Sequence, residues 1–325
     1  MIHISNLSKT FGNHKALNGL NLSINQGSIY GLVGVNGSGK TTAIKHLAGI
    51  YKQDKGTVTI AGQPIYDNAP LKAKIGYIPD ELYFFPGYNL KMLSRFYGNM
   101  YKTFSNAHYN KLLNLLQLDE TRRVSRFSKG MQKQAAFALT LSAMPEVLLL
   151  DEPIDGLDPL IRKEIFRQII EDVADRNMTV LISSHNLKEM DDICDAVGII
   201  KDGQMSVERD LDDLKTDIHK VQVAFEPGHP GLENTPGLTI LHRESRGTVE
   251  LLVIRASESE LTAKIKAQNP LIYDYLPLTL EEIFIYENNR GGILPPADNV
   301  SHNPERQNTT PTNTLTKEAN SENPN

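Results

Sequence analysis

The architecture of this 325-residue chain is indicated by one glycine-rich segment, Gly34-Val35-Asn36-Gly37-Ser38-Gly39-Lys40-Thr41. Four residues separate its outer glycines, and Lys-Thr follows the second, which is the pattern of a loop that binds phosphate. The apolar run Ser28–Val33 before it has the length of a strand, and Thr41–Gly49 after it suits a helix that ends at glycine. This context disfavours the alternative of an ordinary glycine-rich turn.

The residues of this loop suit the binding of a nucleotide's phosphates and Mg²⁺. The glycines allow successive backbone N–H groups to point at phosphate oxygens, and the start of the helix adds a positive dipole end. We expect Lys40 to reach the β- and γ-phosphates of a nucleotide, and the Thr41 hydroxyl to ligate Mg²⁺. The remaining residues predicted to contact the nucleotide here are Gly34, Val35, Asn36, Gly37, Ser38, Gly39 and Thr42.

Two acidic residues downstream point to the same chemistry. The wholly apolar run Val147–Leu150 is typical of a strand buried in a parallel sheet, and Asp151 and Glu152 follow it directly. An acid at this end of a buried strand suits Mg²⁺, directly or through water. Glu152 would point differently and could act as the general base toward water. Strand-end acids that only meet solvent are the competing interpretation, which the phosphate loop upstream disfavours.

The rest of the chain alternates strands and helices, which predicts an α/β sheet with a helical insertion at about 86–145. Before the insertion we expect strands at Ile2–Leu7, Leu20–Ile24, Thr57–Ile60 and Ile75–Ile78. Within and after it we expect helices at Lys111–Leu118, Ala135–Leu141 and Leu160–Arg176, and a strand at Thr179–Ile182.

The composition changes twice toward the C-terminus. Residues 215–290 are expected to form a small α+β domain after a cassette at 1–214, with strands Val221–Phe225 and Val249–Ile254 and helices Ser257–Ala267 and Leu280–Glu287. Residues 291–325 are rich in Asn, Thr, Pro and Ser, which predicts a disordered tail.

Composition also narrows the function classes. The net charge of −5 provides no basic field, so nucleic acid is not expected as a partner. The single cysteine, Cys194, excludes a disulfide framework, and we expect it to be a small buried residue without a redox role. No apolar run approaches ~18 residues, and the first residues lack a basic region followed by an apolar run, so no signal peptide is expected. These observations predict a soluble, cytoplasmic protein.

A further segment, Phe127-Ser128-Lys129-Gly130-Met131-Gln132-Lys133-Gln134, resembles the signature of ABC-type ATPases, usually Leu-Ser-Gly-Gly-Gln. The chain from about Met1 to Val207 is similar to the ATP-binding subunit of an ATP-binding-cassette transporter. The resemblance implies that Ser128, Lys129, Gly130 and Met131 face the γ-phosphate of ATP bound to the opposite subunit. Lys129 replaces a glycine and Met131 a glutamine, a form that resembles ABC-2 export-type cassettes. A plain helix cap at Ser128 is the alternative.

Four further positions resemble motifs of that family. Phe11 matches the aromatic residue that stacks on adenine, with a core phenylalanine as the alternative. Asp80 stands where the family has its Q-loop glutamine, and the resemblance implies a ligand of Mg²⁺ or water. Asp155 and Asp158 lie in the segment that resembles the D-loop at the dimer interface. His185 resembles the histidine that contacts the γ-phosphate, although a lone histidine is more often structural.

Two other segments leave both interpretations open. The aromatic run Tyr83–Tyr88 stands where the family contacts the coupling helix of its membrane subunit, but it could equally be core packing. Leu278–Phe284 resembles an ending common in export-type cassettes, with either a dimer-supporting or a purely structural role.

The resemblance implies a P-loop NTPase (RecA-like) core with an antiparallel β subdomain and a helical subdomain. It further implies ATP and Mg²⁺ as cofactors, and Lys40, Glu152 and His185 as catalytic residues. Two copies of the chain, or one copy and a related cassette, would pair head to tail. They would energise a separate polytopic membrane subunit of an exporter at the cytoplasmic face of the membrane. Two alternatives remain: a soluble ABC ATPase that is not coupled to transport, and a regulatory module that holds ATP with little turnover.

Overall fold

The computed structural model describes residues 1–154, 156–211, 218–226, 228–232, 235–279, 281–283 and 286. The predicted tail at 291–325, the D-loop residue Asp155 and the predicted domain boundary at 214/215 lie outside these residues. Of the predicted helix Leu280–Glu287, residues 281–283 and 286 are described and are helical.

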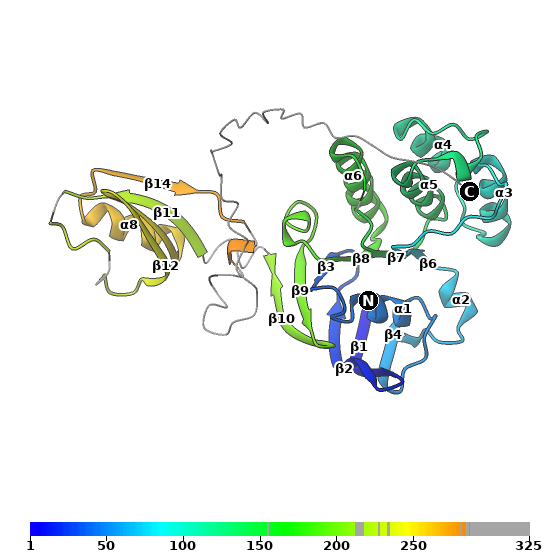
Figure 1. Ribbon diagram of the computed structural model, residues 1–325, viewed down its shortest axis with the longest axis horizontal. Coiled ribbons are helices and arrows are strands. Elements are labelled where there is room, and N and C mark those ends of the chain that lie inside the picture. Colours follow the sequence, from blue (N-terminus) through cyan, green and yellow to red (C-terminus); the bar gives the residue numbers. More distant parts are fainter. Residues whose placement is uncertain are drawn as a thin grey trace, which may run out of the picture.

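The centre of the cassette is a six-stranded sheet in the order β10-β9-β3-β8-β7-β6 (Figure 1). All neighbouring pairs are parallel except β9 and β10, which pair antiparallel at one edge. Every residue of β3, β7 and β8 is buried, as expected for parallel strands covered on both faces. The strands are β3 (Ile29–Val33), β6 (Ile75–Ile78), β7 (Val147–Asp151), β8 (Thr179–Ser184), β9 (Ala196–Lys201) and β10 (Gln204–Asp210).

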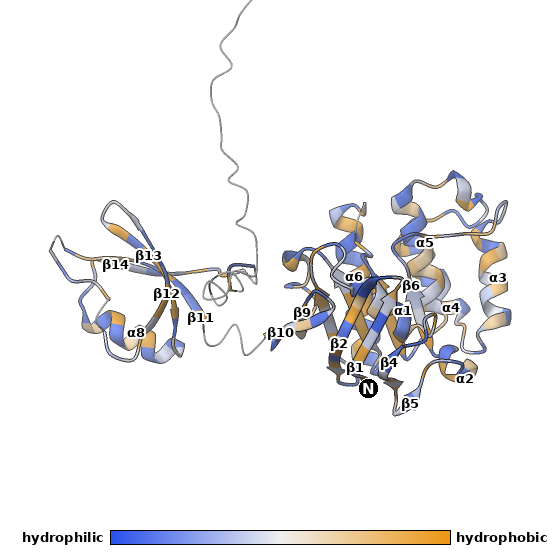
Figure 2. Cartoon of the chain, turned by 60° about the horizontal axis from the view of Figure 1, so that its bottom comes forward, coloured by the Kyte–Doolittle hydropathy of each residue, from blue (hydrophilic) through white to orange (hydrophobic). Residues whose placement is uncertain are grey.

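An antiparallel sheet from the N-terminal part of the chain packs on this core. Its order is β2-β1-β4-β5, with β1 (Ile2–Phe11), β2 (His14–Ile24), β4 (Lys55–Ile60) and β5 (Gln63–Pro64). Helix α1 (Lys40–Leu47) lies against both sheets, because its buried Ile44 and Leu47 share one apolar cluster with Leu17 of β2 and Leu149 of β7. Figure 2 shows the hydrophobic residues concentrated on these strands. Helix α2 (Ala69–Lys72) follows β5.

The helical insertion is confirmed as a subdomain of three helices. Helices α3 (Leu90–Met100), α4 (Asn106–Leu115) and α5 (Lys129–Ser142) each begin after a side chain that accepts a hydrogen bond from the first turn: Asn89, Ser105 and Ser128. The short 3₁₀ helix η1 (Val124–Arg126) precedes α5. Helix α4 begins five residues before the predicted start, because Ser105 supplies the cap. Helix α6 (Pro159–Arg176) returns to the central sheet.

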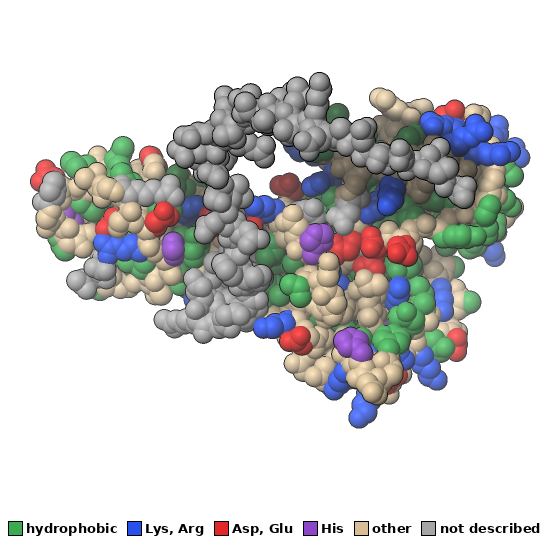
Figure 3. Space-filling model, viewed as in Figure 1, with side chains coloured by type: hydrophobic (Ala, Val, Ile, Leu, Met, Phe, Trp, Pro, Cys, Tyr) green, Lys and Arg blue, Asp and Glu red, His purple; other side chains and the backbone are tan. Residues whose placement is uncertain are grey.

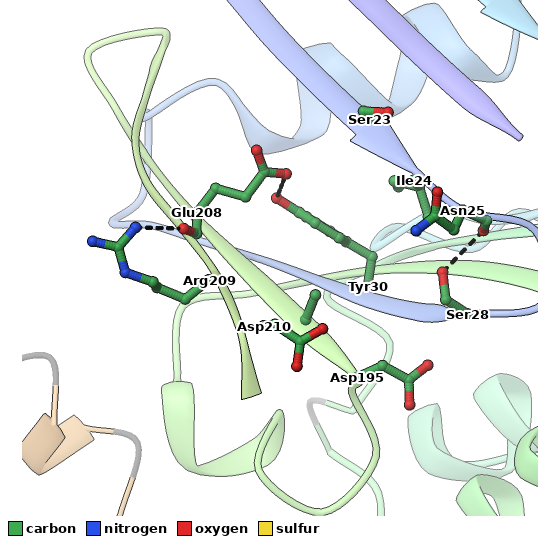
Figure 4. A pocket seen from close by; sticks show the side chains of 10 residues that line it. Ser23, Ile24, Asn25, Ser28, Tyr30, Asp195, Glu208, Arg209 and Asp210 are labelled. Atoms are coloured by element: carbon green, nitrogen blue, oxygen red, sulfur yellow. Dashed lines mark hydrogen bonds between the residues drawn. The ribbon is translucent and has the colours of Figure 1, made fainter. Parts of the chain in front are cut away.

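A hydrogen bond from one tyrosine connects β3 to β10 at the edge of the central sheet (Figure 4). The Tyr30 hydroxyl on β3 donates a hydrogen bond of 2.7 Å to Glu208 Oε1 on β10, across the intervening β9. A Cβ at Gly198 of β9 would lie 2.2 Å from this hydroxyl, so only glycine allows the ring to cross. Burial, and then Glu208, raise the pKa of Tyr30. The phenol therefore stays protonated and can donate.

Cys194 lies after the 3₁₀ helix η2 (Leu187–Glu189) and directly after the turn at 191–193. The residue is buried beside Gly31 of β3, as expected. Burial raises the pKa of its thiol, so the reactive thiolate is disfavoured.

The strands from Ile218 onward form a third sheet, which is four-stranded and antiparallel, in the order β12-β13-β11-β14. Helix α8 covers one face, where Leu261 and Ile265 pack on Val221 and Leu252. The elements are β11 (Ile218–Ala224), β12 (Thr239–Arg246), β13 (Val249–Arg255), α8 (Glu258–Ala267) and β14 (Ile272–Leu276). This is the α+β arrangement that the sequence predicts. Within the described ranges of the whole chain, every helix is too short or too polar to cross a membrane.

Candidate functional site

The phosphate loop joins β3 to α1, and its glycines are required by close contacts. A Cβ at Gly34 would lie 2.5 Å from the Ile200 carbonyl oxygen, and one at Gly39 would lie 2.8 Å from the Ala16 carbonyl oxygen. Gly39 also has a φ of 112°, a conformation that side chains rarely adopt. The glycine spacing in the sequence therefore reflects how tightly this loop is held against β9 and β2.

Lys40 begins α1 and is buried, with 5% of its surface exposed. Its ammonium donates a hydrogen bond of 2.6 Å to the Gly34 carbonyl oxygen and lies 3.1 Å from Glu152 Oε1. A buried charge must be paired to be tolerated, and these two contacts pair it. The loop and the strand-end glutamate are thus brought together by one lysine.

A pocket of about 320 Å³ opens over the loop. It collects residues from the β1–β2 turn, the phosphate loop, the start of α1 and the ends of β6 and β7. The lining residues are Phe11, His14, Ala16, Asn36, Gly37, Gly39, Lys40, Thr41, Thr42, Asp80 and Glu152. Gly34, Val35 and Ser38 of the predicted set do not line it, and His14 and Ala16 were not predicted. These two residues follow Phe11 in the sequence, which is the signal that could have found them.

Asp151 lies beneath the pocket, at the end of β7. Its Oδ1 accepts hydrogen bonds from Thr41 Oγ1 at 3.0 Å and from Ser183 Oγ at 2.8 Å. Burial raises the pKa of this carboxyl, and the two hydroxyls oppose the rise. Ser183 was not predicted, although it pairs with Asp151 in the β7–β8 register and so stands beside it at the sheet edge. Two hydroxyls and a carboxylate form a hard oxygen donor set.

Both the backbone and the carboxylate of Glu152 are held by neighbouring side chains. Its φ of 45° is left-handed, which is rare for a residue with a side chain. Its N–H donates to Ser183 Oγ at 3.1 Å, and Lys133 Nζ donates to its carbonyl oxygen at 2.9 Å. The carboxylate lies between two cationic or polar groups, because Oε2 is 3.0 Å from His185 Nδ1 and Oε1 faces Lys40. The three predicted catalytic residues therefore meet at one carboxylate.

Phe11 and Asp80 lie at the rim of the pocket. Phe11 is 43% exposed and packs edge-to-face on Tyr51 with the ring centroids 5.3 Å apart, so the alternative of a core phenylalanine is wrong. Asp80 follows β6 and its Oδ1 is 4.0 Å from Lys133 Nζ. An exposed ring and an exposed carboxylate at the two sides of a phosphate loop leave room for a base and for a cation, respectively.

The signature residues lie elsewhere. Ser128 caps α5, with its Oγ accepting a hydrogen bond of 3.2 Å from the Met131 N–H, and Lys129 is exposed. None of residues 128–131 lines the pocket of this chain. Asp158 caps α6 by accepting from the Leu160 N–H at 2.9 Å. The structure thus separates these predicted residues from the phosphate loop of the same chain.

Comparison with known proteins identifies the family. The model of the ABC transporter family matches residues 17–155, which contain the phosphate loop and the signature. The chain is 32% identical to the ABC transporter ATP-binding protein YtrB of Bacillus subtilis, over 88% of this chain and 97% of that protein. The chain belongs to the ABC transporter ATP-binding family. It is also 30% identical to the Nod factor export ATP-binding protein I of Burkholderia orbicola, over 87% and 95% of the two chains.

Solved ABC structures share the fold. The ATP-binding subunit of an ABC transporter superposes with a TM-score of 0.62 at 26% identity, over 66% of this chain and 92% of that one. A dimeric bacterial ABC transporter cassette gives a TM-score of 0.59 at 23% identity, over 65% and 99%. The family match and these relatives together show that the chain is an ATP-binding ABC ATPase, a subunit of a transporter.

Proposed function

We propose that the described pocket hydrolyses MgATP, with Lys40 on the β- and γ-phosphates and Glu152 as the general base. The convergence of Lys40, Glu152 and His185 on one carboxylate, next to the Asp151–Thr41 pair, supports this assignment. The loop backbone and Lys40 provide positive charge where the phosphates carry negative charge. Phe11, exposed at the rim, offers a face on which adenine can stack.

The residues beside the phosphate loop fit Mg²⁺. Thr41 and Asp151 supply a hydroxyl and a carboxylate within 3.0 Å of each other, and Asp80 lines the same pocket. Such hard oxygen ligands, completed by phosphate oxygens, are what Mg²⁺ prefers. When bound, the ion would neutralise charge on the phosphates. No three His, Cys, Asp or Glu side chains form a metal cluster in the described part of the chain.

In the hydrolytic step, Glu152 accepts a proton from water. The water oxygen forms a bond to the γ-phosphorus, the bond from that phosphorus to the ADP oxygen breaks, and ADP and phosphate leave. Ser183 and Lys133 hold the Glu152 backbone while His185 holds its carboxylate. Lys40 stays on the phosphates and balances their charge. Each residue thus has a task that its observed contacts allow.

The complete site is proposed to need a second cassette. Residues 128–131 lie outside the pocket of their own chain, and Ser128 and Lys129 are exposed at the start of α5. Head-to-tail pairing would bring them to the γ-phosphate held by a partner, as in the family. Asp155 and Asp158 would lie at that interface. A solved bacterial ABC transporter cassette of the same fold is dimeric.

The membrane partner is proposed to contact the helical subdomain. Aromatic and apolar side chains there line a second pocket of about 170 Å³ between the segment after β6 and α3, including Tyr83, Phe85, Phe96 and Met100. Hydrophobic side chains also gather on the helical subdomain at the right of Figure 3. Tyr83 is 80% exposed, and such exposure of a large aromatic residue marks a contact surface. The cassette would attach peripherally, through this subunit, to the cytoplasmic face of the membrane.

The direction of transport is proposed to be export. The relative from Burkholderia orbicola is named a Nod factor export protein, and the Ser-Lys-Gly-Met form at 128–131 resembles export-type cassettes. Residues 215–290 are proposed to be a separate domain, because α8 and its sheet enclose an apolar core of their own. No contact with nucleic acid is proposed.

The test is Glu152→Gln in the full chain. The amide keeps the size of the side chain but cannot accept the proton, so turnover of MgATP should fall about 100-fold or more while ATP binding persists. Size-exclusion chromatography with MgATP should then show a stable dimer. Unchanged turnover would refute the general-base assignment. Co-purification of a polytopic membrane protein with the tagged wild-type chain tests the transporter role, and its absence would favour a soluble ABC ATPase.

A further inference from the structure

Helix α5, which begins with the signature residues, contacts the catalytic loop of its own chain at two points. The catalytic loop is the segment that follows β7 and contains Glu152. In the first turn of α5, a Cβ at Gly130 would lie 2.9 Å from the Gly156 carbonyl oxygen, so the helix and this loop are in direct backbone contact. One turn further, Lys133 Nζ donates to the Glu152 carbonyl oxygen at 2.9 Å. Both contacts fall on the segment that follows β7 and contains Glu152.

Lys133 is built into this position. Only 8% of its surface is exposed, and its ammonium lies between the Glu152 carbonyl oxygen and Asp80 Oδ1, which is 4.0 Å away. A lysine is rarely buried unless it is paired, and a hydrogen bond from a charged donor is stronger than a neutral one. The side chain therefore connects three elements: the signature helix, the end of β7 and the segment after β6.

The Glu152 backbone needs such support. A non-glycine residue at a φ of 45° is strained, and strain of this kind persists only where neighbouring contacts enforce it. Ser183 of β8 holds the N–H of this residue and Lys133 of α5 holds its carbonyl. The direction of the carboxylate toward Lys40 and His185 depends on that backbone conformation. Of these two supports, only Lys133 comes from the signature helix.

We propose that Lys133 is a positioning residue: it fixes the Glu152 backbone and thereby couples the signature helix, which serves the partner's ATP, to hydrolysis in its own chain. The inference rests on the proposed function, in which Glu152 is the base and residues 128–131 act across the dimer. A shift of α5 upon contact with the partner's nucleotide is transmitted through the ammonium to the base. Binding of ATP by the phosphate loop does not involve this link.

The experiment compares Lys133→Met with Lys133→Arg in the full chain. Methionine fills the space but donates no hydrogen bond, so kcat for MgATP should fall about 10- to 100-fold, as for a misplaced catalytic group. The dissociation constant for MgATP should stay within about twofold, because the phosphate loop is unchanged. Arginine keeps the charge and the donors and should recover most of kcat. Lys163→Met, which removes an exposed lysine of α6, should match the wild type.

Two readouts separate positioning from simple damage to the fold. Thermal melting should show Lys133→Met folded at the assay temperature, and size-exclusion chromatography with MgATP should show a dimer that accumulates because hydrolysis is slow. If Lys133→Met keeps the kcat of Lys163→Met while Glu152→Gln is inactive, the inference is wrong and the proposed function stands. If Lys133→Arg is as slow as Lys133→Met, the inference is likewise wrong. Full activity of Glu152→Gln would instead overturn the proposed function.

Discussion

The N-termini of α1 and α5 differ in their caps and in the exposure of their first lysine. Helix α1 begins at Gly39, with no side-chain cap, and its first residue Lys40 is turned inward with its ammonium buried. Helix α5 begins at Ser128, whose own hydroxyl occupies the Met131 N–H, and its first residue Lys129 is exposed. In the proposed function, the first N–H groups of α1 bind phosphate inside the pocket. The exposed residues of α5 are proposed to contact the nucleotide of a second cassette.

This difference agrees with the proposal that two subunits share a nucleotide site. The phosphate loop contains buried polar groups that pair with each other, as Lys40 does with Glu152 and Asp151 with Thr41. Such a network is stable within one chain. The signature segment has no comparable network, and its link to the catalytic loop runs through Lys133 and Gly130 instead. Binding and turnover should therefore respond separately to changes in the two segments.

Lys40→Ala should have the largest effect, because it removes the ammonium that faces both the phosphates and Glu152. MgATP turnover should fall to background and ATP affinity should drop strongly, since Glu152 then stands in the pocket without its cationic partner. Turnover and equilibrium binding of a fluorescent ATP analogue would measure both. A Lys40→Ala chain with wild-type ATPase activity would contradict the assignment of the phosphate loop.

Ser128→Ala should separate turnover from binding. We expect turnover to fall about 100-fold, as for loss of one donor to a developing charge, while binding of ATP by the single chain is retained. Loss of the cap also costs about 1 kcal/mol of stability. Ser105→Ala removes the equivalent cap of α4 in the same subdomain and is the matched control. Equal turnover of the two variants would show that Ser128 is a cap only.

Sequence patterns were most informative where local geometry requires particular residues. The phosphate loop, the buried strands β3 and β7, and the two acids at the end of β7 were all predicted, because glycine spacing and apolar runs report directly on close contacts and burial. Helix α6 was also predicted to within one residue at its start, where Asp158 and Pro159 form a cap.

The residues that were missed depend on contacts between distant segments. Ser183 stands beside Asp151 only because β7 and β8 pair in one register, and Lys133 meets Glu152 only because α5 packs on the end of β7. Strand β12 was also missed, since its sequence Thr-Ile-Leu-His-Arg-Glu-Ser-Arg is polar, as suits the edge of a sheet. A pattern along the chain does not contain these pairings.

Phe11→Ala should weaken ATP binding without another effect, and less than Lys40→Ala does. Stacking of a base on an aromatic ring contributes ~1–3 kcal/mol, so the dissociation constant for ATP should rise about tenfold. Thermal stability should hardly change, because the ring is 43% exposed. Phe85→Ala removes a similarly exposed ring at the other pocket and should leave ATP affinity unchanged. Affinity unaltered by Phe11→Ala would place the adenine elsewhere.

The smallest predicted change in stability is that of Asp151→Asn in the chain without nucleotide. Burial raises the folded-state pKa of Asp151, so its ionisation above that pKa opposes folding, and this cost disappears as the pH falls through the raised pKa toward the ordinary aspartate value. An asparagine Oδ1 can still accept from Thr41 and Ser183 without the charge. The melting midpoint without nucleotide should therefore rise by about 2 °C at pH 7, and by less at acidic pH.

Exposed Asp67→Asn is the control for this last change, because asparagine tolerates the φ of 58° at that position and no buried charge is removed. Its melting midpoint should match the wild type at both pH values. MgATP turnover of Asp151→Asn should be lost, since the carboxylate proposed to hold the cation is gone. A lower melting midpoint for Asp151→Asn would contradict this prediction. It would show that the charge of Asp151 stabilises the folded pocket.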